Sequence, residues 1–322
     1  MKRFSSIAAL AAFLLTATAC GDDTSSANDG AAPTTGVAAD PTQVADTPAP
    51  DTSEGAASTA PMSEVPMAII SLSPTHTEMM FAIGADDLLI AVDDQSNYPA
   101  AALDKPHDLS GFEPNVEAIA ALHPDLVLIA DDFNDLTGQL GALGIEVWSG
   151  PAPATFDDVY AQIEQLGALT GHIGEAAELV AQMQSDIEAA VASAPALVEP
   201  ASFYHELDDT LYSVTSNTFI GSVYGLFGLV NLADGVEAGN DYPQLNAEYI
   251  VSQNPGYIFL ADSKCCGQTA QTVAARDGWS ATDAVQHGNV IAIDDDIASR
   301  WGPRLVDFIA AVSAALAKVS TG

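Results

Sequence analysis

The sequence feature that most limits the fold is an internal repeat of a helix, a turn and a strand. Residues 115–131 align without a gap to residues 246–262, and six of the seventeen aligned positions are identical. Each copy reads as a helix with an early glutamate, an X-Pro turn and an apolar strand that ends in aspartate. The chain therefore carries the same unit twice, with Glu117 and Glu248 at equivalent positions.

Short apolar runs alternate with amphipathic stretches on both sides of the repeat. The first series has runs at 68–72, 88–92, 126–130 and 145–148, and the second has runs at 202–204, 211–214, 257–261 and 290–293. Strands separated by helices are typical of parallel α/β layers. The sequence therefore predicts an α/β fold of two lobes, each built on a parallel sheet.

A stretch with helical periodicity separates the two series. Apolar residues recur at helical spacing over 156–169 and again over 177–191, before Pro195 and Pro200. This pattern predicts one long helix, or two in series. We divide the folded part into an N-terminal lobe at 67–155, a single interlobe helix at 156–195 and a C-terminal lobe at 196–322. Parallel sheets bind ligands at the carboxyl ends of their strands, so we expect the ligand cleft between the lobes.

The N-terminus has the pattern of an export signal. Lys2 and Arg3 precede an apolar run, and small residues lead into Cys20. We interpret residues 1–19 as a lipoprotein signal peptide and Cys20 as the acylated first residue of the mature chain. Residues 21–66 contain no aromatic, leucine, isoleucine or basic residue, so we expect 20–66 to be a tether. The predicted location is the extracytoplasmic face of the cell membrane.

The chain is strongly acidic. Its formal net charge is −36, and loss of Lys2 and Arg3 with the signal leaves 6 basic against 44 acidic residues, or −38. Such a surface disfavours nucleic acid and anionic headgroups as partners. The two other cysteines, Cys265 and Cys266, are adjacent and form either a strained vicinal disulfide or two free thiols.

Candidate ligand-binding residues follow the predicted strands of both lobes. Aromatic rings can pack against a flat macrocycle, while hydroxyl and amide groups set its orientation. A guanidinium offers a donor fork to an anionic ligand, although Arg300 could instead pair with the acidic residues 294–296. The predicted ligand-binding residues are Ser73, Tyr98, Phe112, Phe133, Tyr204, Arg300 and Trp301.

Several ordered motifs carry a family resemblance. Residues 70–78, the Ser-Asn-Tyr-Pro segment at 96–99 and the Glu117 helix resemble the periplasmic binding proteins for vitamin B12 and iron chelates, as do residues 212–219 and 294–304. The resemblance implies two lobes bridged by one long helix, little hinge closure, and ligand delivery to the permease and ATPase subunits of an ABC importer. It also implies that Glu117 and Glu248 contact the permease, and that the ligand is a corrinoid or a ferric siderophore.

Three other functions remain as alternatives. A receptor for free Zn or Mn needs three or four histidine or carboxylate ligands. His76 and His205 could reach the cleft, but the other histidines are scattered, so we predict no metal site and no cofactor. An enzyme on this fold is disfavoured because the chain lacks the G-x-S-x-G, P-loop and G-x-G-x-x-G motifs. A structural lipoprotein is the third alternative.

Overall fold

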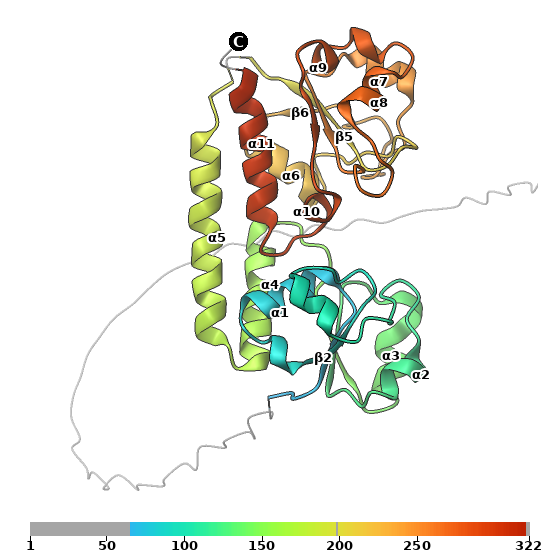
Figure 1. Ribbon diagram of the computed structural model, residues 1–322, viewed down its shortest axis with the longest axis vertical. Coiled ribbons are helices and arrows are strands. Elements are labelled where there is room, and N and C mark those ends of the chain that lie inside the picture. The colour runs from blue at the N-terminus through green and yellow to red at the C-terminus, as the bar shows by residue number, and fades with distance from the viewer. Residues whose placement is uncertain (1–64, 198, 320–322) are drawn as a thin grey trace, which may run out of the picture. The chain divides into compact units, whose positions relative to one another are not determined.

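The computed structural model describes residues 65–197 and 199–319 (Figure 1). The predicted signal peptide, Cys20 and all of the tether except Val65 and Pro66 lie outside these residues. Within them, no helix is both long enough and apolar enough to cross a bilayer.

The N-terminal lobe is built on a parallel sheet of four short strands. These are β1 (Ile69–Ser71), β2 (Leu89–Val92), β3 (Leu126–Ile129) and β4 (Glu146–Ser149), in the order β2-β1-β3-β4. Every residue of β1 and β3 is buried, because helices and loops cover both faces of the sheet. Apolar β-branched residues fit such fully covered strands, which explains the uninterrupted apolar runs in the sequence.

The C-terminal lobe repeats this topology. Its strands are β5 (Ser202–Glu206), β6 (Val230–Asn231), β7 (Tyr257–Leu260) and β8 (Val290–Ala292), all parallel and in the order β6-β5-β7-β8. In both lobes the order is therefore second, first, third, fourth. The two predicted α/β lobes with parallel sheets are confirmed, and the sequence repeat corresponds to the helix and strand α2–β3 in one lobe and α7–β7 in the other.

The remaining elements are helices of very different length. They are α1 (Pro74–Ala82), α2 (Val116–Ala120), α3 (Leu136–Gly141), α4 (Phe156–Thr170), α5 (Ile173–Ser193), α6 (Phe219–Gly225), α7 (Ala247–Gln253), α8 (Ala270–Ala274), α9 (Asp283–Gln286), α10 (Asp295–Ser299) and α11 (Leu305–Val319), with 3-10 turns η1 (Asp86–Leu88), η2 (Ala100–Asp104), η3 (Phe133–Asp135) and η4 (Trp279–Ala281).

The run 211–214, which we expected to be a strand, is not one. Leu211 adopts a left-handed backbone with φ of 71°, and Tyr212 forms only an isolated antiparallel bridge with Gln244. A short run with apolar and aromatic residues favours extended backbone but cannot predict whether a neighbouring strand is available to pair with it. The second strand of this lobe is β6 instead.

The stretch 156–195, predicted as one long helix or two in series and assigned above as a single interlobe helix, forms two helices. A capping box between Thr155 and Asp158 starts α4, and Gly171, with φ of +79°, ends it in the left-handed conformation that favours glycine. The chain then reverses, so that α5 packs alongside α4 and against α11 (Figure 1). Only the 21-residue α5 therefore serves as the long helix between the lobes.

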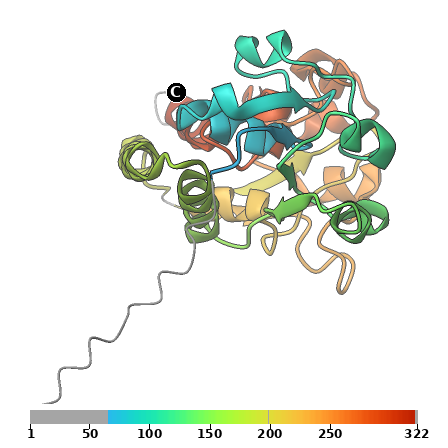
Figure 2. The same cartoon turned by 90° about the horizontal axis from the view of Figure 1, so that it is seen from below.

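One apolar core continues through both lobes. It joins Met79 of α1 to Ile163 of α4 and Met183 of α5, and extends to Phe259 of β7 and Phe308 of α11. Viewed from below, α4 and α5 lie together on one side of the molecule (Figure 2). Two smaller cores cover the other faces of the sheets. Because close-packed apolar contacts oppose separation, this shared core resists independent movement of the lobes.

Candidate functional site

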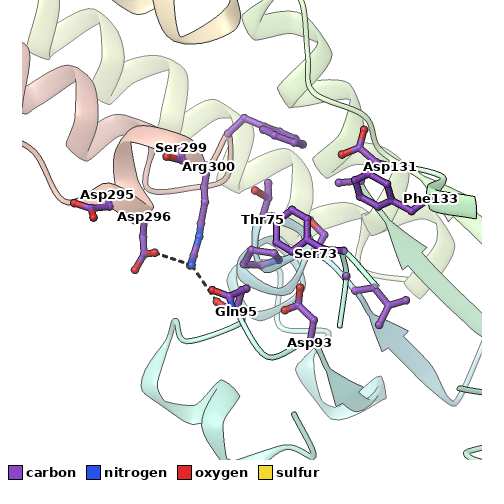
Figure 3. A pocket seen from close by; sticks show the side chains of 16 residues that line it. Ser73, Thr75, Asp93, Gln95, Asp131, Phe133, Asp295, Asp296, Ser299 and Arg300 are labelled. Carbon is purple, nitrogen blue, oxygen red and sulfur yellow. Dashed lines mark hydrogen bonds and ion pairs between the residues drawn. The ribbon is translucent and has the colours of Figure 1, made fainter. Parts of the chain in front are cut away.

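A cavity of about 380 Å³ lies between the two lobes, at the carboxyl ends of the strands. Both lobes contribute to its wall, as expected for a ligand cleft in a fold with parallel sheets (Figure 3). The lining residues are Leu72, Ser73, Pro74, Thr75, Asp93, Gln95, Gly111, Phe112, Ala130, Asp131, Phe133, Asp295, Asp296, Ser299, Arg300 and Trp301. Five of the seven predicted ligand-binding residues are in this set: Ser73, Phe112, Phe133, Arg300 and Trp301.

Two phenylalanines give the N-terminal wall exposed apolar surface. Phe112 is 68% exposed and Phe133 is 37% exposed, and their ring centroids lie 6.1 Å apart. Phe133 belongs to η3, in which Asn134 and Asp135 have φ of 58° and 59°. Left-handed backbone at two consecutive residues other than glycine is unfavourable and is often found in ligand-binding loops. Exposed rings on such a loop are typical of a binding surface.

The wall also requires a glycine. A Cβ at Gly111 would lie 2.5 Å from the carbonyl oxygen of Leu72 and 3.1 Å from a carboxylate oxygen of Asp93. The backbone of the loop before α2 can therefore approach the end of β1 only without a side chain. No motif in the sequence identified Gly111 as a cavity residue.

Tyr204, predicted to bind the ligand, does not line the cavity. It is fully buried, with its ring 5.9 Å from that of Trp279 in the outer core of the C-terminal lobe. The prediction was wrong because β5 continues to Glu206, which makes Tyr204 a mid-strand residue and not part of the following loop. His205 is also fully buried and forms a 2.7 Å hydrogen bond with the Tyr224 hydroxyl.

Tyr98 is exposed but is not among the residues that line the cavity. The guanidinium carbon of Arg304 lies 4.1 Å from the centroid of its ring, a cation–π contact that connects the two lobes. A contact between Tyr98 and the ligand stays a prediction.

Arg300 and Arg304 of the C-terminal lobe meet one buried glutamate of the N-terminal lobe. Glu78 is 3% exposed; Arg300 Nη1 donates to its Oε1 at 2.8 Å, and Arg304 Nε donates to its Oε2 at 2.9 Å. We call these three residues the interlobe clamp. The hydrogen bond to Glu78 raises the pKa of Arg304 above its ordinary value. The clamp therefore joins α1 to the segment between α10 and α11 by buried charged hydrogen bonds.

The remaining donors of Arg300 are also occupied. Nη1 donates to Asn97 Oδ1 at 2.9 Å. Nη2 donates to the Gln95 carbonyl oxygen at 3.0 Å and to Asp296 Oδ1 at 2.8 Å (Figure 3). With the bond to Glu78, four of the five guanidinium N–H groups have acceptors. Arg300 lines the cavity, but the donor fork that we expected it to offer to an anionic ligand is already used within the protein.

Trp301 forms a fixed wall of the cavity. Its indole N–H donates to Gln162 Oε1 of α4 at 2.9 Å, and this hydrogen bond holds the ring in one orientation. Behind it lies His76, fully buried, with its ring centroid 6.3 Å from that of Trp301 and 4.9 Å from that of Trp148. Burial lowers the pKa of His76 to about 4, so the imidazole is neutral at pH 7.

Four carboxylates line the cavity, and none of them is among the seven predicted ligand-binding residues. Asp93 accepts a hydrogen bond from the Ser96 hydroxyl at 2.5 Å, and burial raises its pKa to about 6. The Asp295 carboxylate accepts hydrogen bonds from the backbone N–H of Lys264 and Cys265. Asp296 pairs with Arg300, whereas Asp131 is exposed. Asp93 and Asp131 directly follow the apolar runs 88–92 and 126–130, whereas nothing in so acidic a sequence separates Asp295 and Asp296 from other surface carboxylates.

Cys265 and Cys266 are exposed free thiols in the structure, so the vicinal disulfide considered above is not present. Their loop is held to the cavity wall by Asp295, which also accepts a hydrogen bond from the Ser263 hydroxyl at 2.9 Å. In the part of the chain that the structure covers, no three histidine, cysteine, aspartate or glutamate side chains are placed to hold a metal ion.

Glu117 and Glu248 occupy matching places in the two lobes. Each is exposed in the first turn of a short helix, α2 or α7, that begins after a capping asparagine. Asn115 Oδ1 accepts from the Ala118 N–H at 3.0 Å, and Asn246 Oδ1 accepts from the Tyr249 N–H at 2.8 Å. The repeated asparagine is therefore a helix cap. Figure 1 places α2 and α7 on the same side of the view, one on each lobe.

Comparison with known proteins supports the fold and the cavity together. The family model for the periplasmic binding protein matches residues 69–297. An uncharacterized ABC transporter substrate-binding lipoprotein of Bacillus subtilis is 31% identical over 250 residues, 75% of this chain and 77% of that protein. A cobalamin-binding protein of Halobacterium salinarum is 30% identical over 250 residues, 75% of this chain and 67% of that protein. The crystal structure of the vitamin B12 binding protein of Vibrio cholerae matches with a TM-score of 0.65 and 26% identity, covering 80% of this chain and 98% of that one.

Two parallel α/β lobes with a cavity at their junction define a two-lobed solute-binding protein. With a family match over most of the folded part, the chain belongs to the periplasmic binding protein family. Membership of this family implies a location outside the cytoplasm, and the predicted family resemblance is confirmed.

Proposed function

We propose that the protein captures a cobalt corrinoid outside the cytoplasm and delivers it to the permease and ATPase of an ABC importer. Acylation of Cys20 would hold the receptor at the membrane, and the following tether would let it reach both medium and permease. The observation that carries the proposal is the interlobe cavity with its exposed aromatic wall. The relatives named for cobalamin and vitamin B12 support this choice of ligand.

The chemistry of the wall suits a complete chelate better than a free metal ion. Phe112, Phe133 and Trp301 offer ring surface, and Ser73 and Thr75 are polar groups at the end of β1. Burial of apolar ligand surface against such rings is worth about 25 cal/mol per Å². The cavity wall contains four carboxylates but no histidine or cysteine, and among the described residues no three such groups are placed to hold one metal ion. A metal would therefore arrive with its coordination sphere already filled by the chelator.

A ferric siderophore is the second candidate. The same wall can pack against the apolar parts of a hydroxamate chelate, and the metal is again fully coordinated before it arrives. The two candidates differ in shape, since a corrin is a broad flat ring.

Calorimetric titration tests the proposed function. The mature chain from residue 20, carrying Cys20→Ser so that it stays unlipidated, should bind cyanocobalamin one-to-one with a Kd of about 1 µM or tighter, or −8 kcal/mol. Ferric hydroxamates, haem and Zn²⁺ are titrated in parallel. If only a ferric hydroxamate binds tightly, the ligand is a ferric siderophore and the function is iron import. Heat from Zn²⁺ alone, or from none of the ligands, would contradict chelate capture.

If Glu117 and Glu248 dock the protein on the permease, replacing them should impair uptake without weakening ligand binding. In the double variant Glu117→Ala/Glu248→Ala, uptake of labelled cobalamin by cells should fall at least tenfold, because charge complementarity governs docking. Its affinity for cobalamin should stay within about twofold, since neither residue lines the cavity.

The matched control is Glu175→Ala, an exposed glutamate in the first turn of α5. This variant should transport normally. Loss of cobalamin affinity in the double variant, or normal uptake by it, would contradict the docking role.

A further inference from the structure

We infer that the cavity selects among metal chelates by charge, accepting neutral or cationic chelates and rejecting anionic ones. The inference rests on the proposed function and narrows its ligand class. It follows from the charges on the wall and from the hydrogen bonds that occupy every arginine near it.

The wall carries four carboxylates and one guanidinium. Arg300 is neutralised within the protein, because it pairs with Glu78 at 2.8 Å and with Asp296 at 2.8 Å. Asp131 is exposed on the opposite lobe and forms no ion pair with any residue in the described ranges 65–197 and 199–319. Figure 3 shows Asp131 beside Phe133, on the far side of the cavity from Asp296. A bound chelate therefore meets excess negative charge near the aromatic surface that would hold it.

The structure offers little positive charge to compensate an anionic ligand. Arg304 donates two hydrogen bonds to Glu78, and Arg276 donates two to Glu206. Lys264 Nζ lies 2.6 Å from Asp294 and 3.0 Å from Asp296. An anionic chelate would have to break these pairs, leaving a buried carboxylate without its partner.

The polar groups that remain suit neutral amides. Ser73, Thr75 and Ser299 are hydroxyl-bearing residues of the wall, and the side-chain amide of Gln95 both donates and accepts hydrogen bonds. Such groups can bind primary amides or hydroxamate carbonyls without a net charge on the ligand. The wall can therefore orient a neutral chelate by hydrogen bonds, and its own carboxylates repel a ligand that carries additional carboxylates.

A series of cobalamins with graded charge tests the inference. Cyanocobalamin is compared with derivatives in which one or two peripheral propionamides are hydrolysed to propionates, a change that adds negative charge with almost no change of size. At low ionic strength each added charge should weaken binding by roughly tenfold, from Coulomb repulsion at about 7 Å in a medium of intermediate dielectric. About 0.3 M salt should reduce this penalty. Hydroxamates provide a second pair: a cationic linear ferric trihydroxamate and its N-succinylated, anionic counterpart.

Variants identify the source of the selection. Asp131→Asn should lower the ratio of neutral to anionic affinity several-fold. Asp87→Asn is the matched control, an exposed aspartate before β2 and so at the opposite end of the sheet from the cavity, and it should leave the ratio unchanged.

Equal affinities for all members of the charge series would contradict selection by charge, but they would not contradict chelate capture. A penalty that neither salt nor Asp131→Asn reduces would also contradict selection by charge, because that result indicates steric exclusion. If no member of either series binds, the proposed function fails and the selection fails with it.

Discussion

Replacing Glu78 by Ala is expected to lower the free energy of unfolding by about 3–5 kcal/mol. The carboxylate is almost completely buried, and Arg300 and Arg304 have side chains only 8% and 12% exposed. Without Glu78 both guanidinium groups lose their shared partner in a region that water reaches poorly. Breaking a buried charge network by removing one partner is far more damaging than removing a surface pair.

The measurement is chemical denaturation monitored by tryptophan fluorescence, supported by calorimetric melting, in which Tm should fall by about 10 °C. Lys264→Ala is the control, because its side chain is 52% exposed although it also pairs with two aspartates. It should cost less than about 1 kcal/mol. Similar small losses in both variants would mean that the interlobe clamp contributes no more than a surface ion pair.

The double variant Phe112→Ala/Phe133→Ala is expected to lose cobalamin affinity by about 100-fold with little loss of stability. Each aromatic side chain at the centre of a binding surface is worth about 1–2 kcal/mol when truncated. Both rings are substantially exposed, so the folded state gains little from their burial and Tm should move by less than about 2 °C.

Isothermal titration and thermal melting on the same samples check this result. Tyr212→Ala is the control, since Tyr212 is also 39% exposed but does not line the cavity. That variant should bind cobalamin normally. An unchanged affinity in the phenylalanine variant would remove the aromatic wall as the basis of the proposed function, and unfolding of the variant would show that the rings support the fold instead.

The repeat was the most informative part of the sequence, because a local pattern that occurs twice predicts the same helix and strand at the same position in each lobe. Asparagine caps, early glutamates and X-Pro turns are short-range features, and the structure has the same helix and strand at both copies. The paired positions of Glu117 and Glu248 were predictable for this reason. The aromatic wall was partly predictable, since Phe133 closely follows β3 and Phe112 lies just before the repeated helix α2, and the sequence had already identified both elements.

Errors occurred where the answer depended on element ends or on distant partners. Tyr204 was expected at the end of a strand because the predicted run 202–204 stops there, two residues before β5 ends. Arg300 was considered a ligand contact because a guanidinium offers a donor fork, and the alternative pairing with residues 294–296 is found in the structure at Asp296. Its decisive partner, Glu78, is 222 residues away in the sequence and belongs to the other lobe.

The sequence by itself determined the α/β class, the two lobes, the family and the edge of each sheet at which a ligand binds, because these depend on periodicity and on ordered local motifs. Only the tertiary structure decided which groups at that edge remain free. A guanidinium or a carboxylate binds whichever partner the fold brings within about 3 Å. That proximity arises from the packing of α1 against the segment between α10 and α11, which no local pattern encodes.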